Sequence, residues 1–167
     1  MLEMDLEIEE LAPHEVTING AKGKPHTFSI CQLLLPAGIM LEAEELGKGE
    51  SAGYRFAVFG DYDSDVQTLY DELLTKVTRG ISQTYIKRRK RGPEIVGNRV
   101  VGVIACDEQH EDRIPLVIVD GKRYTWAQLG KMLMTFEGWQ FKLDIVDSAD
   151  DVFAPPVPTV WMSTARE

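Results

Sequence analysis

The residues best suited to chemistry are three aspartates at alternate positions, Asp61, Asp63 and Asp65, just before a long amphipathic stretch. Carboxylate oxygens are the ligands that Ca²⁺ and Mg²⁺ prefer, so this cluster could serve a metal-assisted hydrolase. An EF-hand loop is excluded, because its sixth position would be Val66 where a sharp turn needs glycine. The same acids also suit a helix N-terminus, where they accept hydrogen bonds from unpaired backbone N–H groups. We interpret them as a helix cap and keep the hydrolase as an alternative.

A run of five cations, Lys87, Arg88, Arg89, Lys90 and Arg91, is the second candidate. Such a run could contact phosphates, and an aromatic residue just before it, Tyr85, could stack on a base. The chain as a whole argues against nucleic acid, because 27 Asp and Glu residues exceed 18 Lys and Arg residues and give a formal charge of −9. Nucleic-acid binding through Lys87–Arg91 therefore stays an alternative. An acidic protein partner, or the acidic N-terminus of a neighbouring subunit, fits the run as well.

Aromatic and methionine residues form a third group near the end of the chain. Trp126, Met132, Phe136 and Trp139 could line a groove or an interface, where such residues are favoured, although the same pattern is typical of a hydrophobic core. Trp161 lies in a proline-rich tail and could dock on the body or on a neighbouring subunit. These residues make a protein partner or self-association the expected form of binding.

Other familiar catalytic patterns do not occur. The sequence lacks a phosphate-binding glycine loop, a nucleophile elbow and a Cys-x-x-Cys pair, and we expect no cofactor. Cys31 and Cys106 stand 75 positions apart in predicted strands, which is typical of buried free thiols. The mixed segment from Cys106 to Asp112, which includes His110, is interpreted as a solvated loop. No apolar run approaches the roughly 20 residues that span a bilayer, and the acidic start is unlike a secretory signal. We therefore expect a cytoplasmic protein that does not enter the membrane.

The elements that must position these groups follow from hydrophobic periodicity. Alternation predicts strands over 14–20, 26–35, 39–46, 54–59, 99–106, 114–119 and 139–146. Apolar spacings of three and four predict a helix from about residue 66 to about residue 90, with the cations of 87–91 at its C-terminal end. Gly80, inside this helix, would allow close approach to the sheet. Thr125 and Gln128 match a capping box that begins a second helix, which ends near Phe136 before a glycine cap at Gly138.

Together these elements predict an α+β fold: a mostly antiparallel sheet of six to seven strands, with two helices packed on one face. Residues 1–13 form an acidic N-terminal segment and residues 14–146 a single domain. Residues 147–167 form a tail rich in proline and aspartate, which favours extended or disordered chain.

Two stretches resemble the patterns of a known family. Residues 119–143, which read VDGKRYTWAQLGKMLMTFEGWQFKL, are similar to the C-terminal signature of an uncharacterised bacterial domain family of unknown function. Residues 53–60, GYRFAVFG, resemble an earlier strand of that family, which a long helix also follows there. The resemblance implies a bacterial protein and carries no catalytic residues. With no catalytic set in the chain, we expect a non-enzymatic interaction or binding module.

Overall fold

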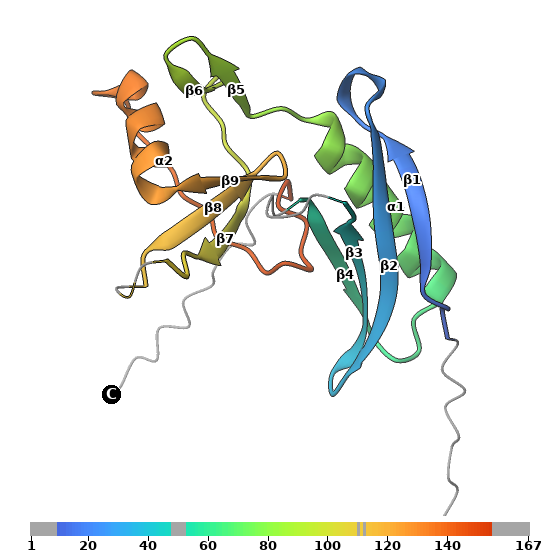
Figure 1. Ribbon diagram of the computed structural model, residues 1–167. Helices are drawn as coiled ribbons and strands as arrows, with labels where there is room; N and C mark the ends of the chain where they lie inside the picture. Colours follow the sequence, from blue (N-terminus) through green and yellow to red (C-terminus); the bar gives the residue numbers. More distant parts are fainter. Residues whose placement is uncertain (1–9, 48–52, 110, 112, 155–167) are drawn as a thin grey trace, which may run out of the picture.

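The computed structural model describes residues 10–47, 53–109, 111 and 113–154. The described chain is α+β, and it forms two lobes that lie side by side in Figure 1. We call residues 10–82 the first unit and residues 85–136 the second unit.

The first unit is an antiparallel meander covered by one long helix. Its sheet has the order β1-β2-β3-β4, with each strand beside its sequence neighbour because short loops join them. The strands are β1 (His14–Asn19), β2 (Pro25–Leu35), β3 (Gly38–Glu45) and β4 (Arg55–Gly60). A short 3₁₀ turn, η1 (Ala21–Gly23), joins β1 to β2, and within it Lys22 has φ 58°.

Helix α1 (Val66–Ser82) packs on one face of this sheet (Figure 1). Its apolar stripe enters the first hydrophobic core, in which Leu73 and Val77 are fully buried against strand residues such as Phe28. Gly80 faces β4, where a Cβ atom would overlap the ring of Phe56. The expected close approach of the helix to the sheet at this glycine is therefore confirmed.

The second unit contains two small sheets and a short helix. The hairpin of β5 (Ile86–Arg89) and β6 (Gly92–Ile95) stands apart from a three-stranded sheet of order β7-β8-β9. Its strands are β7 (Val103–Cys106), β8 (Pro115–Val119) and β9 (Lys122–Thr125). Helix α2 (Trp126–Leu133) begins at the predicted Thr125–Gln128 capping box and continues into η2 (Met134–Phe136). Both sheets and α2 contribute to a second core: Ile86, Val117, Val119 and Met132.

The predicted single sheet is wrong, although its α+β class and antiparallel pairing are confirmed. The nine strands of the described residues fall into separate sheets of four, two and three, and each helix covers a different sheet. Local alternation identifies strands but carries no information on which strands share a ladder. The prediction of one domain over residues 14–146 stays a prediction, since two cores are present and contacts also join the units.

The first helix is shorter than expected, and the cations 87–91 do not lie at its end. Helix α1 stops at Ser82 because Gln83 adopts extended backbone (φ −93°, ψ 147°). One carboxylate oxygen of Asp120 then accepts the N–H groups of Tyr85 and Ile86, both at 2.9 Å, which holds the chain in an extended course. Lys87, Arg88 and Arg89 therefore belong to β5, and Lys90 and Arg91 form the two-residue turn.

The predicted strand 139–146 is also wrong. Gly138, with φ 85°, redirects the chain after η2, and residues 139–146 run without a partner strand among the described residues. Every side chain from Trp139 to Val146 is exposed, so neither face of this segment is buried.

Candidate interaction surfaces

The extended segment, residues 138–146, presents alternating apolar and polar side chains to solvent. The exposed fractions are 65% for Trp139, 91% for Phe141, 72% for Leu143 and 71% for Ile145. The Nζ of Lys142 lies 3.4 Å from Oδ2 of Asp144. An ion pair between positions i and i+2 places both polar side chains on one side, as in a β-strand. The segment therefore has one apolar face and one more polar face, and the side chains of both are exposed.

The N-terminal end of the extended segment is fixed to the second unit. The N–H of Trp139 donates to the carbonyl of Phe136 at 2.9 Å. The rings of the same two residues meet edge to face at 5.4 Å. Such aromatic pairs contribute about 0.5–1.5 kcal/mol beyond burial. The segment thus leaves η2 in a defined direction.

The C-terminal end is held on α1 by a group of contacts that we call the clasp: Lys76, Arg79, Asp151 and Phe153. The Nζ of Lys76 donates to the carbonyls of Ala57, Ser148 and Asp150 at 2.8–2.9 Å. Arg79 pairs with Asp151 at 3.3 Å, and the guanidinium groups of Arg79 and Arg99 lie over the ring of Phe153 at 5.2 and 5.3 Å. The extended segment is therefore anchored at both ends and open between them.

The clasp should weaken in acid. The pKa of Asp151 lies below its usual value, because the carboxylate accepts the Phe153 N–H and also faces Arg79. A lowered pKa means that the ionised carboxylate stabilises the clasp above its usual pKa near 4, and that this contribution disappears as pH falls through the lowered value. Exchange of the Phe153 amide hydrogen, followed by NMR after correction for intrinsic rates, should accelerate as pH falls through that window. Asp151→Asn should abolish this dependence; an unchanged pH profile in the variant would contradict the assignment.

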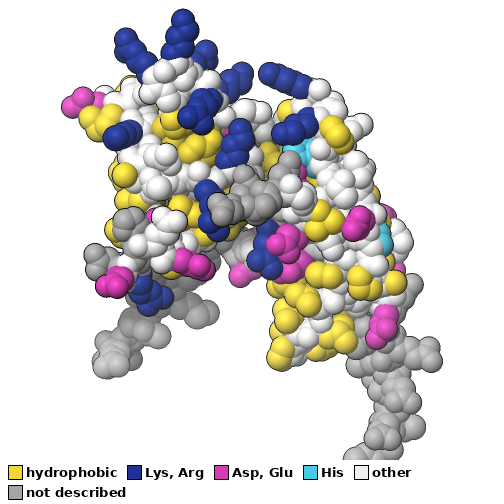
Figure 2. All heavy atoms as spheres, in the orientation of Figure 1, with side chains coloured by type: hydrophobic (Ala, Val, Ile, Leu, Met, Phe, Trp, Pro, Cys, Tyr) yellow, Lys and Arg dark blue, Asp and Glu magenta, His cyan; other side chains and the backbone are white. Residues whose placement is uncertain are grey.

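Lysine and arginine side chains gather at the upper end of the molecule in Figure 2, over the β5–β6 hairpin and on the neighbouring lobe. A pocket of about 460 Å³, which we call the basic pocket, opens beside this hairpin. Residues from η1, the α1–β5 connection, β5 and β9, and one residue just after β6, line it, and no carboxylate is among them: Ala21, Lys22, Thr84, Ile86, Lys87, Arg88, Val96 and Lys122. Sequence reasoning found Lys87 and Arg88 but missed Lys22, Thr84 and Lys122, which no local pattern connects to them.

Behind the basic pocket, polar groups join the two units. Asp120 (φ 53°) and Gly121 (φ 72°) form the two-residue turn between β8 and β9, and the carbonyl of Gly121 accepts the N–H of Gly53 at 3.1 Å. Burial raises the pKa of the Tyr54 hydroxyl, and nearby Asp120 and Glu45 add to the effect. The second oxygen of Asp120 and the hydroxyl of Tyr85 are buried without a protein hydrogen-bond partner.

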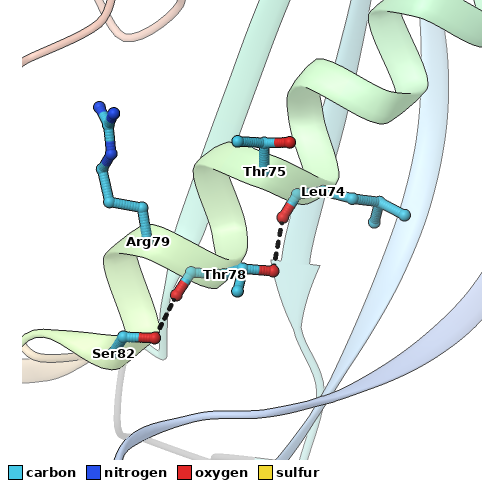
Figure 3. Close-up of a pocket in the computed structure, with 5 residues that line it drawn as sticks. All are labelled: Leu74, Thr75, Thr78, Arg79 and Ser82. Carbon is cyan, nitrogen blue, oxygen red and sulfur yellow. Dashed lines mark hydrogen bonds between the residues drawn. The ribbon is translucent and has the colours of Figure 1, made fainter.

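A second pocket of about 430 Å³ lies along the exposed side of α1 and is shown in Figure 3. Its hydroxyl groups already donate to the helix backbone: Thr78 to the carbonyl of Leu74, and Ser82 to the carbonyl of Thr78. Arg79 is engaged by the clasp. This surface therefore offers no polar group that is poised for a ligand.

One of the three clustered aspartates takes the helix-cap position. Asp65 is the N-cap of α1, and its carboxylate accepts the N–H groups of Gln67 and Thr68 and the Thr68 hydroxyl. These hydrogen bonds, first that from the Thr68 hydroxyl, lower the pKa of Asp65. Within residues 10–47, 53–109, 111 and 113–154, no three His, Cys, Asp or Glu side chains come close enough to hold a metal ion. The alternative of a hydrolase using Asp61, Asp63 and Asp65 thus gains no support from geometry.

The residues of the aromatic and methionine group differ in how far they are buried. Met132 is buried in the second core and Phe136 is half-buried, whereas Trp126 and Trp139 are more than half exposed. Trp161, together with His110 and Asp112, lies outside the described residues. Cys31 is partly buried rather than enclosed, and Cys106 is exposed, so the expectation that both thiols are buried is wrong. None of the described helices is long and apolar enough to cross a membrane.

Two different family models match the chain, and the boundary between them separates the residues of the first core from those of the second. Residues 9–82 match the model of a domain of unknown function (DUF7686), and residues 85–150 match that of another domain of unknown function (DUF7713). The resemblance to an uncharacterised domain family is confirmed, and the two stretches that carry it fall in different models. No curated protein and no solved structure matches the chain.

Proposed function

We propose that the protein is a non-enzymatic interaction module that self-associates through the extended segment, residues 138–146. The observation that carries the proposal is an extended segment with exposed apolar side chains, anchored at both ends and without a partner strand among the described residues. Monomeric proteins rarely leave contiguous apolar patches beyond roughly 300–600 Å² in water, and larger ones mark interaction sites. A free strand edge is also a template for pairing with another chain.

The order of charges in the segment favours a second copy as the occupant. In an antiparallel pair of identical strands with Leu143 on the two-fold axis, Lys142 of each copy lies opposite Asp144 of the other. The same register places Phe141 opposite Ile145. Opposite charges and apolar pairs across a strand contribute roughly 0.2–1 kcal/mol each, and two-fold symmetry makes every such pair occur twice. The ion pair already present within each copy would extend into a network of four charges.

Sedimentation velocity of the full chain, from low micromolar to several hundred micromolar, tests the proposal. We expect a reversible dimer that Leu143→Asp weakens at least tenfold, because this change places two like charges at the axis. Leu34→Asp is the matched control, since Leu34 is a 54% exposed leucine of β2 in the first unit. It should leave the dimer unchanged.

A charge swap tests the register. Lys142→Asp should weaken the dimer roughly tenfold by opposing two pairs of acids, and Lys142→Asp with Asp144→Lys should restore it. A monomer at all concentrations, or equal effects of the two leucine variants, would overturn the proposal. If the double variant does not regain the dimer affinity of the original chain, the antiparallel register is wrong.

A further inference from the structure

We propose that the basic pocket binds a small phosphate-bearing ligand. Four cations line it, Lys22, Lys87, Arg88 and Lys122, with the Thr84 hydroxyl beside them and no carboxylate. Charged hydrogen bonds to phosphate oxygens are about twice as strong as neutral ones, and arginine can form two in parallel. The pocket therefore has the donors for a dianion but no group to neutralise them.

The concentration of positive charge is local, because the protein as a whole carries −9. Like charges that face one another cost free energy unless an anion lies between them. Arg89, the next cation on the hairpin, has an acidic partner: its Nε lies 3.5 Å from the carboxylate of Glu94. Glu94 is the one acid between residues 86 and 95. Glu94 is thus engaged with Arg89, while the lining of the pocket holds four cations and no carboxylate.

The walls of the basic pocket are fixed before any ligand arrives. Asp120 holds the N–H groups of Tyr85 and Ile86, and Ile86 is buried in the second core. The carbonyl of Tyr85 accepts the N–H of Val96 at 2.7 Å, which fixes the backbone of another lining residue. Lys22 adopts the left-handed backbone that residues with a Cβ atom rarely take, and such conformations cluster at binding sites. Preformed walls reduce the ordering cost of binding.

The size and lining favour a small ligand over a nucleic-acid strand. A volume of about 460 Å³ lies in the range of small-molecule sites, and Ala21, Ile86 and Val96 give it an apolar portion. The cations at the hairpin tip, Lys90 and Arg91, lie outside the lining. A polyanionic strand would need an extended basic track, and a chain with a formal charge of −9 repels polyanions at long range.

Titration calorimetry of the full chain with inorganic pyrophosphate and with ADP, at low salt, tests the proposal. We expect both compounds to bind, and Arg88→Gln with Lys122→Gln to weaken binding at least tenfold. Lys90→Gln with Arg91→Gln removes the same charge from the hairpin tip and should weaken it less than twofold. All four side chains are exposed, and a thermal melt checks that both double variants fold.

Two results would overturn the proposal. One is the absence of heat with both compounds. The other is an equal loss of affinity in the two double variants, which would mean general attraction to charge. A single-stranded oligonucleotide, titrated in parallel, distinguishes the competing ligand: tight binding of the strand that depends on Lys90 and Arg91 would identify the hairpin as a nucleic-acid contact.

Discussion

Glu45→Ala is expected to lower the free energy of unfolding by about 1–3 kcal/mol for each of the two buried groups that lose their hydrogen-bond partner. Oε1 of Glu45 lies 2.6 Å from Nδ1 of His26, and both residues are more than 90% buried. Its other carboxylate oxygen accepts the N–H of Tyr54 at 3.1 Å. Alanine would leave the imidazole and this N–H without their acceptor, in a region that water does not reach.

Urea denaturation followed by circular dichroism measures this loss. Glu42→Ala is a matched control on the same strand: Glu42 pairs with Arg55 at 3.3 Å, and the side chains are 20% and 62% exposed, against 2% for the Glu45 side chain. Exposed pairs contribute about 0–1 kcal/mol, so this control should change stability by less than about 1 kcal/mol. If the two variants lose similar amounts of unfolding free energy, burial does not determine how much the His26–Glu45 contact contributes to stability.

Leu73→Ala is expected to cost about 2–5 kcal/mol, because it removes a fully buried side chain from the centre of α1 and leaves a cavity. Chemical denaturation gives the magnitude, and Leu34→Ala, at an exposed leucine, should have little effect. We expect the amide hydrogens of β2 and β3 to exchange faster in the Leu73 variant, since these strands pack on the same core.

The same experiment tests how many domains the chain has. If residues 14–146 form a single domain, the amides of β8, in the second core, should lose the same protection as those of β2. Unchanged protection in β8 would show that the two units unfold separately. Either result is read directly from residue-resolved exchange.

The parts of the fold that the sequence predicts well are those that local chemistry determines. The meander of β1–β4 follows from alternation and short loops, and α1 begins where Asp65 can cap it. The Thr125–Gln128 capping box begins α2. In each case a few neighbouring residues supply the hydrogen bonds or the apolar face that the element needs.

The errors arise where distant residues decide. The sequence around Ser82 contains no signal that ends α1. Asp120, 35 positions beyond Tyr85, supplies the acceptor that holds the chain extended there. The alternation of residues 139–146 predicts a strand that does not form among the described residues, since periodicity cannot show whether a partner strand exists. Lys22 and Lys122 reach the basic pocket through tertiary folding alone.

The clasp brings the chain back to the helix from which the second unit departs. The second unit departs from α1 after Ser82 and returns to the same helix at Lys76, which holds the carbonyls of Ser148 and Asp150. Residues 76 and 82 are separated by about 9 Å along the helix axis. The chain between Ser82 and Ser148 therefore begins and ends close to the same helix. A short glycine linker could replace residues 83–147. The four-stranded sheet, α1 and residues 148–153 would then keep their present positions.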